Sequence, residues 1–355
     1  MADAKLYLRP IGFLYGATAK GAMAEGLALP LAGGPIAFTA AELIEGVPGS
    51  SKRRLFTAHA LAKSGDPDLA ALLRRVTGPR PPFAGVALDP PALMGVVNVT
   101  PDSFSDGGLY DSKEAAIVHA AELAAAGAAI IDIGGESTRP GSDAVNEAEE
   151  LARVVPVIEG LAGLNAVISI DTRKARVARE AAKAGAKIFN DVSALTYDRK
   201  SLEAAAEAGF SLVLMHAQGE PKTMQDNPHY ADVVLEVFDY LEARIAAAMA
   251  AGIDRSRIAA DPGLGFGKTL AHNLALLAHT SLFHGLGVPL LIGASRKRFI
   301  QGVSGGEKPP AREPGSQAAA IAAAAQGAQI LRVHDVAGTR QALDVWRASV
   351  FATEN

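Results

Sequence analysis

The chain of 355 residues contains no cysteine. Disulfide bonds, thiolate metal sites and a cysteine nucleophile are therefore excluded, and the absence fits a reducing compartment. No apolar run reaches the roughly 18 residues that a membrane span needs. The N-terminus also lacks a charged stretch followed by a long apolar run, so we expect no signal peptide. The sequence thus predicts a cytoplasmic protein without a membrane partner.

An excess of charge of one sign is lacking as well. Lys and Arg number 34 against 38 Asp and Glu, which gives a formal net charge of -4. Nucleic acids and anionic membranes both favour a basic surface, so we expect neither as the main partner. A local anion site is still compatible with this balance. Hydrophobic residues make up 49% of the chain, which is ample for a sizeable core.

From about residue 92 onward, the sequence repeats one pattern. A short apolar run is followed by a polar or Gly-rich loop and then by an Ala-rich stretch that ends at glycine. Runs rich in Ile, Val and Leu are typical of buried parallel strands. The eight runs are Leu93–Val99, Ala129–Ile133, Ala166–Ile170, Lys187–Asn190, Leu212–Met215, Ile258–Ala260, Leu290–Ile292 and Ile330–Val333. Helices are expected over Lys113–Ala126, Glu147–Leu161, Lys174–Ala184, Val233–Ala250 and Gln317–Ala325.

Eight strand–helix units in about 250 residues have the size of a (β/α)8 barrel. The predicted fold class is therefore α/β, with residues 89–355 forming the barrel. An open doubly wound sheet is the alternative. It is less favoured because the count reaches eight and because no GxGxxG sequence follows the first strand.

Residues 1–88 do not show this strand–helix pattern and are predicted to form a small appended α/β element. They contain a Gly/Pro-rich half, Leu29–Gly49, and a helix is expected through Ser51–Arg75. A Pro-rich linker, Gly78–Phe83, follows. We find no catalytic motif in this part, which favours a role in packing or assembly over a second activity.

The chemistry of a (β/α)8 barrel lies where strands end and loops to helices begin, and the unusual polar residues of this chain lie there. The first strand ends at Asn98, in a loop of small hydroxyls, aspartates and paired glycines. After the second strand, Arg139 offers a planar fork suited to phosphate oxygens, and Pro140 fixes the turn beside it.

Side chains that accept hydrogen bonds, and one amide side chain, lie at the ends of later strands. Asp171, Asn190 and Asp261 end three different strands, and together they suit a flat heterocycle with an amino-pyrimidinone edge. The alternative is that the two aspartates only cap the helices that follow. His216 follows Met215 at a strand end and could line the barrel mouth, but the sequence shows no partner for it.

Cations gather at the last two strand ends. Lys297 lies in Ser295-Arg-Lys, and Arg332 and His334 alternate along a strand, so that both point to one face. With Arg139 they form a cationic pocket on an acidic protein. This pattern predicts a clamp for a diphosphate.

The ordered set of motifs resembles the dihydropteroate synthase family over about 250 residues. The matching segments are Asn98–Gly108, Gly134–Ser142, Ser169–Thr172, Phe189–Val192, Asp261–Lys268, Ser295–Lys297 and Arg332–Val336. The resemblance implies a transferase of folate biosynthesis that joins 6-hydroxymethyl-7,8-dihydropterin diphosphate to p-aminobenzoate and releases diphosphate. It also implies inhibition by sulfonamides, which mimic p-aminobenzoate, and we expect a homodimer.

The resemblance further implies a role for each matching residue. Asp171, Asn190, Met215, Asp261 and Lys297 would bind the pterin. Asn98, Arg139, Arg332 and His334 would hold the diphosphate, with Mg2+ near Asn98, and these four with Lys297 would be catalytic. Thr138, Pro140, Phe266, Ser295 and Lys297 would shape the p-aminobenzoate pocket.

Two other functions remain compatible with a pterin-binding barrel. A methyltetrahydrofolate-dependent methyltransferase would need the aspartates and the asparagine but no diphosphate clamp. A non-catalytic pterin-binding or assembly paralogue would be indicated by an incomplete clamp, whereas the clamp in this sequence is complete.

Overall fold

The computed structural model describes residues 5–99, 109–137 and 141–352. Eight of its strands form one parallel sheet in the order β10-β9-β8-β7-β6-β5-β12-β11. The two outer members approach each other through a parallel bridge between Ala260 and Leu290, which brings the sheet round into a barrel. The predicted (β/α)8 barrel is therefore confirmed, and the open doubly wound sheet is excluded.

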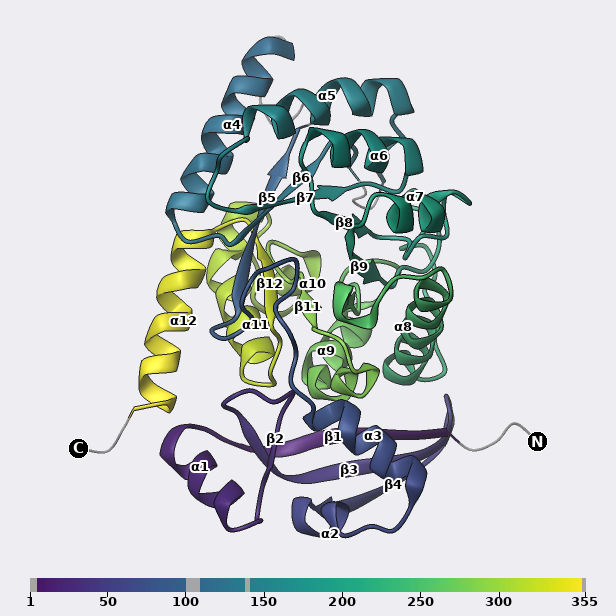
Figure 1. Cartoon of the computed structure of the whole chain (residues 1–355), viewed down its shortest axis with the longest axis vertical. Helices are drawn as coiled ribbons and strands as arrows, with labels where there is room; N and C mark the ends of the chain where they lie inside the picture. Colours follow the sequence, from purple (N-terminus) through teal and green to yellow (C-terminus); the bar gives the residue numbers. More distant parts are fainter. Residues whose placement is uncertain (1–4, 100–108, 138–140, 353–355) are drawn as a thin grey trace.

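The barrel strands and helices alternate along the chain, and the helices surround the strands (Figure 1). The strands are β5 (Ala92–Asn98), β6 (Ile130–Gly134), β7 (Val167–Asp171), β8 (Ile188–Asp191), β9 (Ser211–Met215), β10 (Ile258–Asp261), β11 (Leu291–Ile292) and β12 (Ile330–Val333). The α-helices are α4 (Leu109–Ala125), α5 (Glu147–Gly160), α6 (Ala175–Ala184), α7 (Ser201–Glu207), α8 (Val233–Ala250), α9 (Leu270–Ala278), α10 (Arg298–Ser304), α11 (Glu313–Ala324) and α12 (Val336–Val350). Short 3-10 helices lie at η2 (Arg255–Arg257), η3 (Thr280–Leu286) and η4 (Pro309–Arg312).

The interior of the barrel begins with an apolar layer to which every strand contributes one side chain. Its members are Met94, Ile130, Val167, Ile188, Val213, Ala259, Leu291 and Ile330. Phe83, which precedes the first barrel strand, is fully buried against this layer. The segment before β5 therefore closes the end of the barrel at which the strands begin.

The N-terminal part is an antiparallel sheet with three helices. Its elements are β1 (Lys5–Leu14), α1 (Gly16–Ala24), β2 (Leu29–Pro30), β3 (Ala37–Val47), β4 (Ser50–Thr57), α2 (Ala58–Ala62) and α3 (Pro67–Thr77). The central strand β3 pairs with β1 on one side and with β2 and β4 on the other. The appended α/β element is thus confirmed.

The single helix expected through Ser51–Arg75 is wrong. Residues 50–57 form a strand instead, because their backbone pairs with β3 from Ser50↔Val47 to Thr57↔Ala40. This ladder overrides helix propensity, which is a weak prior. Two helices follow: the Thr57 side chain accepts a hydrogen bond from the first turn of α2, and Asp66 with Pro67 starts α3.

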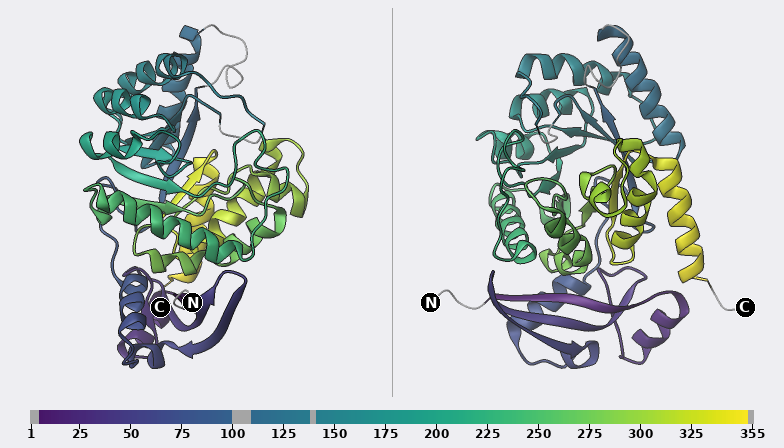
Figure 2. Two further views of the ribbon diagram at one scale, coloured as in Figure 1. Left: turned by 90° about the vertical axis from the view of Figure 1, so that its right-hand side faces the viewer. Right: turned by 180° about the vertical axis from the view of Figure 1, so that it is seen from behind.

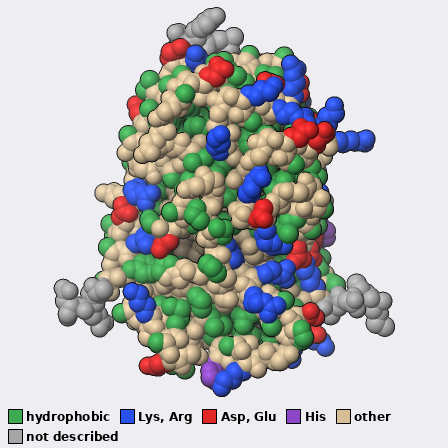
Figure 3. Space-filling model, viewed as in Figure 1, with side chains coloured by type: hydrophobic (Ala, Val, Ile, Leu, Met, Phe, Trp, Pro, Cys, Tyr) green, Lys and Arg blue, Asp and Glu red, His purple; other side chains and the backbone are tan. Residues whose placement is uncertain are grey.

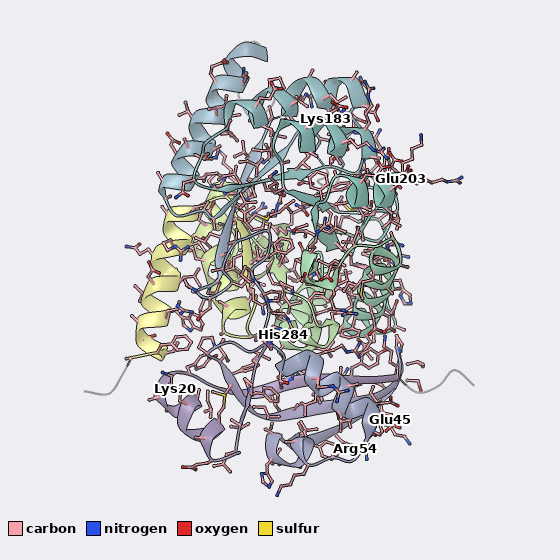
Figure 4. All side chains as sticks on the ribbon, in the orientation of Figure 1. Lys20, Glu45, Arg54, Lys183, Glu203 and His284 are labelled. Atoms are coloured by element: carbon pink, nitrogen blue, oxygen red, sulfur yellow. The ribbon has the colours of Figure 1, made fainter. Side chains whose placement is uncertain are left out.

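The N-terminal sheet lies across one side of the barrel, beneath it in the views of Figure 2. One sheet face packs on α2 and α3. On the other face Tyr7 and Ile44 belong to the main core, and the Tyr7 ring meets Phe238 of α8 edge-on at 5.3 Å. His284 of η3 lies at this boundary (Figure 4) and is fully buried.

Polar contacts join the same two surfaces. The Tyr7 hydroxyl donates to Asp239 of α8 at 2.9 Å, and the Ser281 hydroxyl of η3 donates to the Pro10 carbonyl at 2.8 Å. On the outer surface, acidic, basic and apolar side chains are interspersed (Figure 3). The N-terminal sheet is therefore part of the packed molecule, not a loosely tethered addition.

Deleting residues 1–79, which retains Phe83, should destabilise the barrel because it uncovers Phe238 and the buried face of η3. Each large apolar side chain that is re-exposed costs about 1.5–3 kcal/mol, so the melting temperature should fall by about 10 °C. Thermal unfolding with light scattering measures this. Tyr7→Phe, which removes only the bonds to Asp239, is the mild control. A truncated chain as stable and monodisperse as the whole one would contradict the expectation.

Candidate active site

Beyond the apolar layer, toward the ends of the strands, the barrel lining becomes polar. Residues two apart on a strand share one face, so these positions point inward. They are Val96 and Asn98 on β5, Asp132 and Gly134 on β6, Ser169 and Asp171 on β7, Asn190 on β8, Met215 on β9, Asp261 on β10, Gly293 after β11, and Arg332 and His334 on and after β12. This polar layer brings together residues that lie up to 236 positions apart, from Asn98 to His334.

Arg332 lies among the carboxylates of the polar layer. Its Nε donates to Asp132 Oδ2 at 2.6 Å, and its Nη2 donates to Asp171 Oδ2 at 2.7 Å. Asn190 Nδ2 donates to the same Asp132 oxygen at 3.0 Å. Burial raises the pKa of Asp171 to about 7, an effect that the guanidinium opposes. The carboxylates in turn raise the pKa of Arg332, which keeps its charge.

Asp132 was not among the residues singled out from the sequence. It is fully buried, and its Oδ1 has no hydrogen-bond partner among the described residues. The signal was present: a charged residue interrupts a run of isoleucines two positions before Gly134, on the same inward face. A buried, unpaired acceptor calls for an explanation such as a bound ligand, because it costs about 1–3 kcal/mol if left unpaired.

Lys297 and Asp261 both lie near Gly293. A Cβ atom at Gly293 would lie 3.7 Å from Lys297 Nζ and 3.8 Å from Asp261 Oδ2. Burial lowers the pKa of Lys297 to about 8, although the Asp261 carboxylate favours the charged form. Burial likewise raises the pKa of Asp261, against the effect of Lys297. One donor and one acceptor thus lie close to the same glycine.

Two glycines leave room in the polar layer. At Gly134 an added Cβ would lie 3.7 Å from Asp171 Oδ2 and 3.9 Å from Asn98 Oδ1, and Gly293 occupies the corresponding place beside Lys297. Neither position fills the interior with a side chain, so the polar atoms around them can approach a flat ligand.

The loop that carries Phe266 is held by side chains from several neighbouring elements. Before Phe266, Asp261 Oδ1 accepts from Gly263 N and Lys297 donates to the Leu264 carbonyl. At Gly265, Asn273 Oδ1 accepts from the backbone N–H and Gln225 donates to the carbonyl. Lys268 donates to the Phe266 carbonyl, and Tyr230 donates to the Gly267 carbonyl. Lys297 Nζ lies 4.7 Å from the centre of the Phe266 ring. The Phe266 ring is therefore presented by a loop whose backbone is fixed on both sides.

His216 supports this loop instead of facing the mouth as a free base. Its Nδ1 accepts from Lys268 Nζ at 2.9 Å, and its carbonyl accepts from the same ammonium at 3.2 Å. Burial lowers the pKa of His216 to about 2, so the ring is neutral. The Phe266 carbonyl is the third group in hydrogen-bonding distance of Lys268 Nζ, and burial lowers the pKa of Lys268 well below its usual value.

Ser295 and His334 also lie together. The Ser295 hydroxyl is 3.0 Å from His334 Nδ1 and accepts from the His334 backbone N–H at 3.2 Å. Met215 is buried beside the Asp261 strand, where its backbone pairs with that of Asp261. The structure thus gathers ten of the predicted site residues at one end of the barrel: Asn98, Asp171, Asn190, Met215, Asp261, Phe266, Ser295, Lys297, Arg332 and His334.

Thr138, Arg139 and Pro140 lie outside the described residues, but the segments on either side of them are anchored. Glu136 Oε1 accepts from Arg173 at 3.2 Å and from the Val145 backbone N–H at 3.0 Å. Its Oε2 accepts from Lys174 at 3.1 Å, and Lys174 also contacts the buried Glu150. One buried carboxylate therefore ties residue 136 to residue 145.

Two further findings concern partners. Within the described part of the chain, no three His, Asp or Glu side chains are grouped so that they could hold a metal ion. Among the described helices, none combines the length and the apolar character needed to cross a membrane.

Comparison with known proteins agrees with this geometry. The family model described as "Pterin binding enzyme" matches residues 94–334. Dihydropteroate synthase of Escherichia coli K12 is 51% identical over 274 residues, which cover 76% of this chain and 96% of that protein. The Xanthomonas albilineans dihydropteroate synthase solved with 4-aminobenzoic acid is 51% identical, with a TM-score of 0.72, over 76% of this chain and 97% of that one. The Yersinia pestis enzyme solved with a sulfonamide drug complex is 48% identical, with a TM-score of 0.71, over 74% and 96% of the two chains.

The barrel and the polar layer at its mouth thus define a pterin-binding enzyme, and the chain belongs to that family. Within the family it belongs with the dihydropteroate synthases, transferases of folate biosynthesis. The family, fold and activity implied by the sequence motifs are confirmed. The roles of individual residues stay predictions.

The affinity for the pterin diphosphate should fall as the pH rises through about 8. Below that pH the Lys297 amine is charged, and above it the free enzyme must take up a proton to present an ammonium. The dissociation constant should then rise by about tenfold per pH unit. Calorimetry between pH 7 and 9.5 measures it, with Lys297→Met as the control that lacks the inflection. A constant affinity over this range in the unmodified chain would contradict the assignment.

Proposed function

We propose that the polar layer binds the pterin ring of 6-hydroxymethyl-7,8-dihydropterin diphosphate. The observation that carries the proposal is the Oδ1 of Asp132, which is buried and has no hydrogen-bond partner in the described part of the chain. An N–H group of an amino-pyrimidinone edge would pair with it and relieve the cost of the unpaired acceptor. Asp171 and Asp261 supply further acceptors, Asn190 supplies an amide, and Lys297 donates to the ring carbonyl. Met215 packs on the ring.

The diphosphate would bind beyond the pterin, at the ends of the strands. Arg332 serves two purposes in this proposal. It compensates the buried carboxylates of Asp132 and Asp171, and its remaining N–H groups would donate to phosphate oxygens at the barrel mouth. His334, two residues further along the chain, and Asn98 complete the described part of the clamp, to which Arg139 would add its guanidinium.

Magnesium fits this clamp as an ion that arrives with the substrate. Mg2+ is usually bound through one or two protein oxygens together with substrate phosphates, and the amide oxygen of Asn98 is such a single ligand. The described residues offer no cluster that would hold the ion by themselves. When bound, Mg2+ would neutralise charge on the departing diphosphate.

The reaction needs cations more than it needs a base. An aromatic amine is neutral at pH 7, so its nitrogen can attack without a nucleophile–base pair. The bond between the pterin methylene carbon and the diphosphate oxygen breaks, the diphosphate leaves with the electron pair, and the amine proton goes to solvent after the new C–N bond forms. In this proposal the guanidinium of Arg332 and the His334 ring would stabilise the negative charge as it develops.

The p-aminobenzoate would lie between the fixed Phe266 loop and the Ser295 turn. Phe266 provides an aromatic wall, and Ser295 provides a hydroxyl beside His334. Thr138 and Pro140 would complete the pocket from the segment anchored by Glu136.

The two other functions compatible with the motifs fit less well. A methyltransferase would have no use for Ser295 and His334 beside Arg332 at the mouth. A non-catalytic paralogue would bind the pterin without releasing diphosphate when both substrates are mixed. The homodimer, the cytoplasmic location, and the division into residues 1–88 and 89–355 stay predictions.

Asp132→Asn should weaken pterin diphosphate binding by at least about 30-fold, which corresponds to about 2 kcal/mol. The amide can offer its oxygen either to Arg332 or to the ligand, and in both cases its NH2 group faces a donor. Calorimetry measures the affinity, and a diphosphate-release assay measures the turnover that the unmodified chain should show with both substrates.

Asp191→Asn is the matched control for this substitution. Asp191 is equally buried, but it accepts from Ser193 and Leu195 in its own loop. It should lower the melting temperature and leave the pterin affinity unchanged. Normal affinity in Asp132→Asn would remove Asp132 from the proposed site, and no diphosphate release by the unmodified chain would refute its activity.

Sulfonamides should inhibit by competing with p-aminobenzoate at saturating pterin diphosphate. If both ligands lie against the same ring, Phe266→Ala should raise the KM for p-aminobenzoate and the inhibition constant together, by about tenfold each. Steady-state kinetics measures both constants. Purely non-competitive inhibition, or a change in only one of the constants, would speak against the shared pocket.

A further inference from the structure

The turn Ser295-Arg296-Lys297 carries two proposed site residues on a backbone that requires support. Arg296, between them, has a φ of 59°. Residues with a Cβ atom disfavour this left-handed conformation, and outside glycine it persists only where the surrounding structure enforces it. The contacts around Arg296 therefore show which residues determine where Ser295 and Lys297 point.

Those contacts come from one short segment, Arg312 to Ser316, at the start of α11. The Arg312 Nη1 donates to the Arg296 carbonyl at 2.9 Å. The Ser316 hydroxyl accepts from the Arg296 backbone N–H at 2.9 Å and donates to the Arg312 carbonyl at 2.7 Å. Glu313 pairs with the Arg296 side chain. Both backbone polar groups of the left-handed residue are thus held by this segment.

Arg312 is itself fixed from several sides. It is 7% exposed. Its Nε donates to the Gly306 carbonyl at 2.7 Å, and its Nη2 donates to Gln301 Oε1 at 2.7 Å and to the Glu307 carbonyl at 2.5 Å. The guanidinium therefore fixes the turn to the chain that follows α10.

A glycine lets the two helices approach closely enough for these bonds. A Cβ at Gly315 would lie 2.3 Å from Ile300 Cγ2 in α10, a distance that no side chain tolerates. Ile300 N in turn donates to the Lys297 carbonyl at 3.1 Å. The small residue at position 315 and the bonds from Arg312 and Ser316 therefore act on the same turn.

We propose that Arg312 and Ser316 are positioning residues for the reaction, which hold Arg296 in its left-handed conformation and thereby aim Lys297 at the pterin and Ser295 at the p-aminobenzoate. Neither residue touches a substrate. The inference rests on the site roles in the proposed function, and a displacement of about 1 Å at such a site can cost about 100-fold in rate.

The test compares Arg312→Met with Arg80→Met. Arg80 is also largely buried and also donates to three backbone carbonyls, of Gly78, Arg75 and His284, but at the far end of the barrel. Both variants should lower the melting temperature. Only Arg312→Met should raise the dissociation constant of the pterin diphosphate and the KM for p-aminobenzoate, each by about 10- to 100-fold. Equal effects of the two variants on these constants would overturn the proposal.

A rescue experiment separates positioning from general stability. Glycine adopts a positive φ as readily as a negative one, so Arg296→Gly in the Arg312→Met background should recover most of the lost pterin affinity. If Arg312→Met fails to fold, Ser316→Ala, which removes the acceptor for Arg296 N, takes its place and should raise both constants by several-fold. No recovery by glycine, or unchanged constants in Ser316→Ala, would contradict the proposal.

Lys297→Met distinguishes the failure of this inference from failure of the proposed site. Loss of pterin affinity in Lys297→Met together with normal affinity in Arg312→Met would refute positioning alone. Normal affinity in Lys297→Met would refute the proposed role of the lysine, on which the positioning argument depends.

Discussion

The site depends on one buried cation that lies between two carboxylates. Arg332 contacts Asp132 and Asp171 at 2.6 and 2.7 Å, and these three side chains come from three strands of the barrel. Removing one partner of a buried ion pair leaves an uncompensated charge, which costs about 3–5 kcal/mol. Arg332 contacts only one oxygen of Asp132, and the other oxygen has no hydrogen-bond partner among the described residues. The same ion pairs that hold the polar layer together thus surround the acceptor to which we assign the pterin.

The barrel makes this arrangement possible because the apolar layer that stabilises the fold and the polar layer that holds the proposed site lie at different levels along the strands. The apolar layer at the start of the strands is closed by Phe83, and the polar layer begins two residues further along each strand. Alternation in a strand determines which residues face inward, while closure of the sheet brings the first and last strands together through the pairing of β5 with β12. Arg332 reaches Asp132 across β5 for this reason.

The atoms that face the proposed substrates are held by side chains that do not face them. Lys268 and Tyr230 fix the Phe266 loop, Glu136 ties residue 136 to residue 145, and Arg312 fixes the turn before Lys297. A site whose polar groups are already oriented loses little free energy to reorganisation when the substrate binds. The N-terminal sheet packs against α8 and η3.

The sequence by itself determined the strand–helix rhythm, the eight strands to within about two residues at each end, and the polar residues at the strand ends, because each of these is a local pattern. It also determined the family, since the motifs are contiguous. It missed Asp132, which lies inside an apolar strand run, and it predicted a helix where Ser50–Thr57 pairs with β3. Only the tertiary structure decided that Arg332 lies between two carboxylates, that His216 is a neutral acceptor for Lys268, and that Arg312 holds the turn at Arg296. These contacts join residues 16 to 200 positions apart in the sequence or depend on burial, and no local pattern encodes which distant group a side chain will meet.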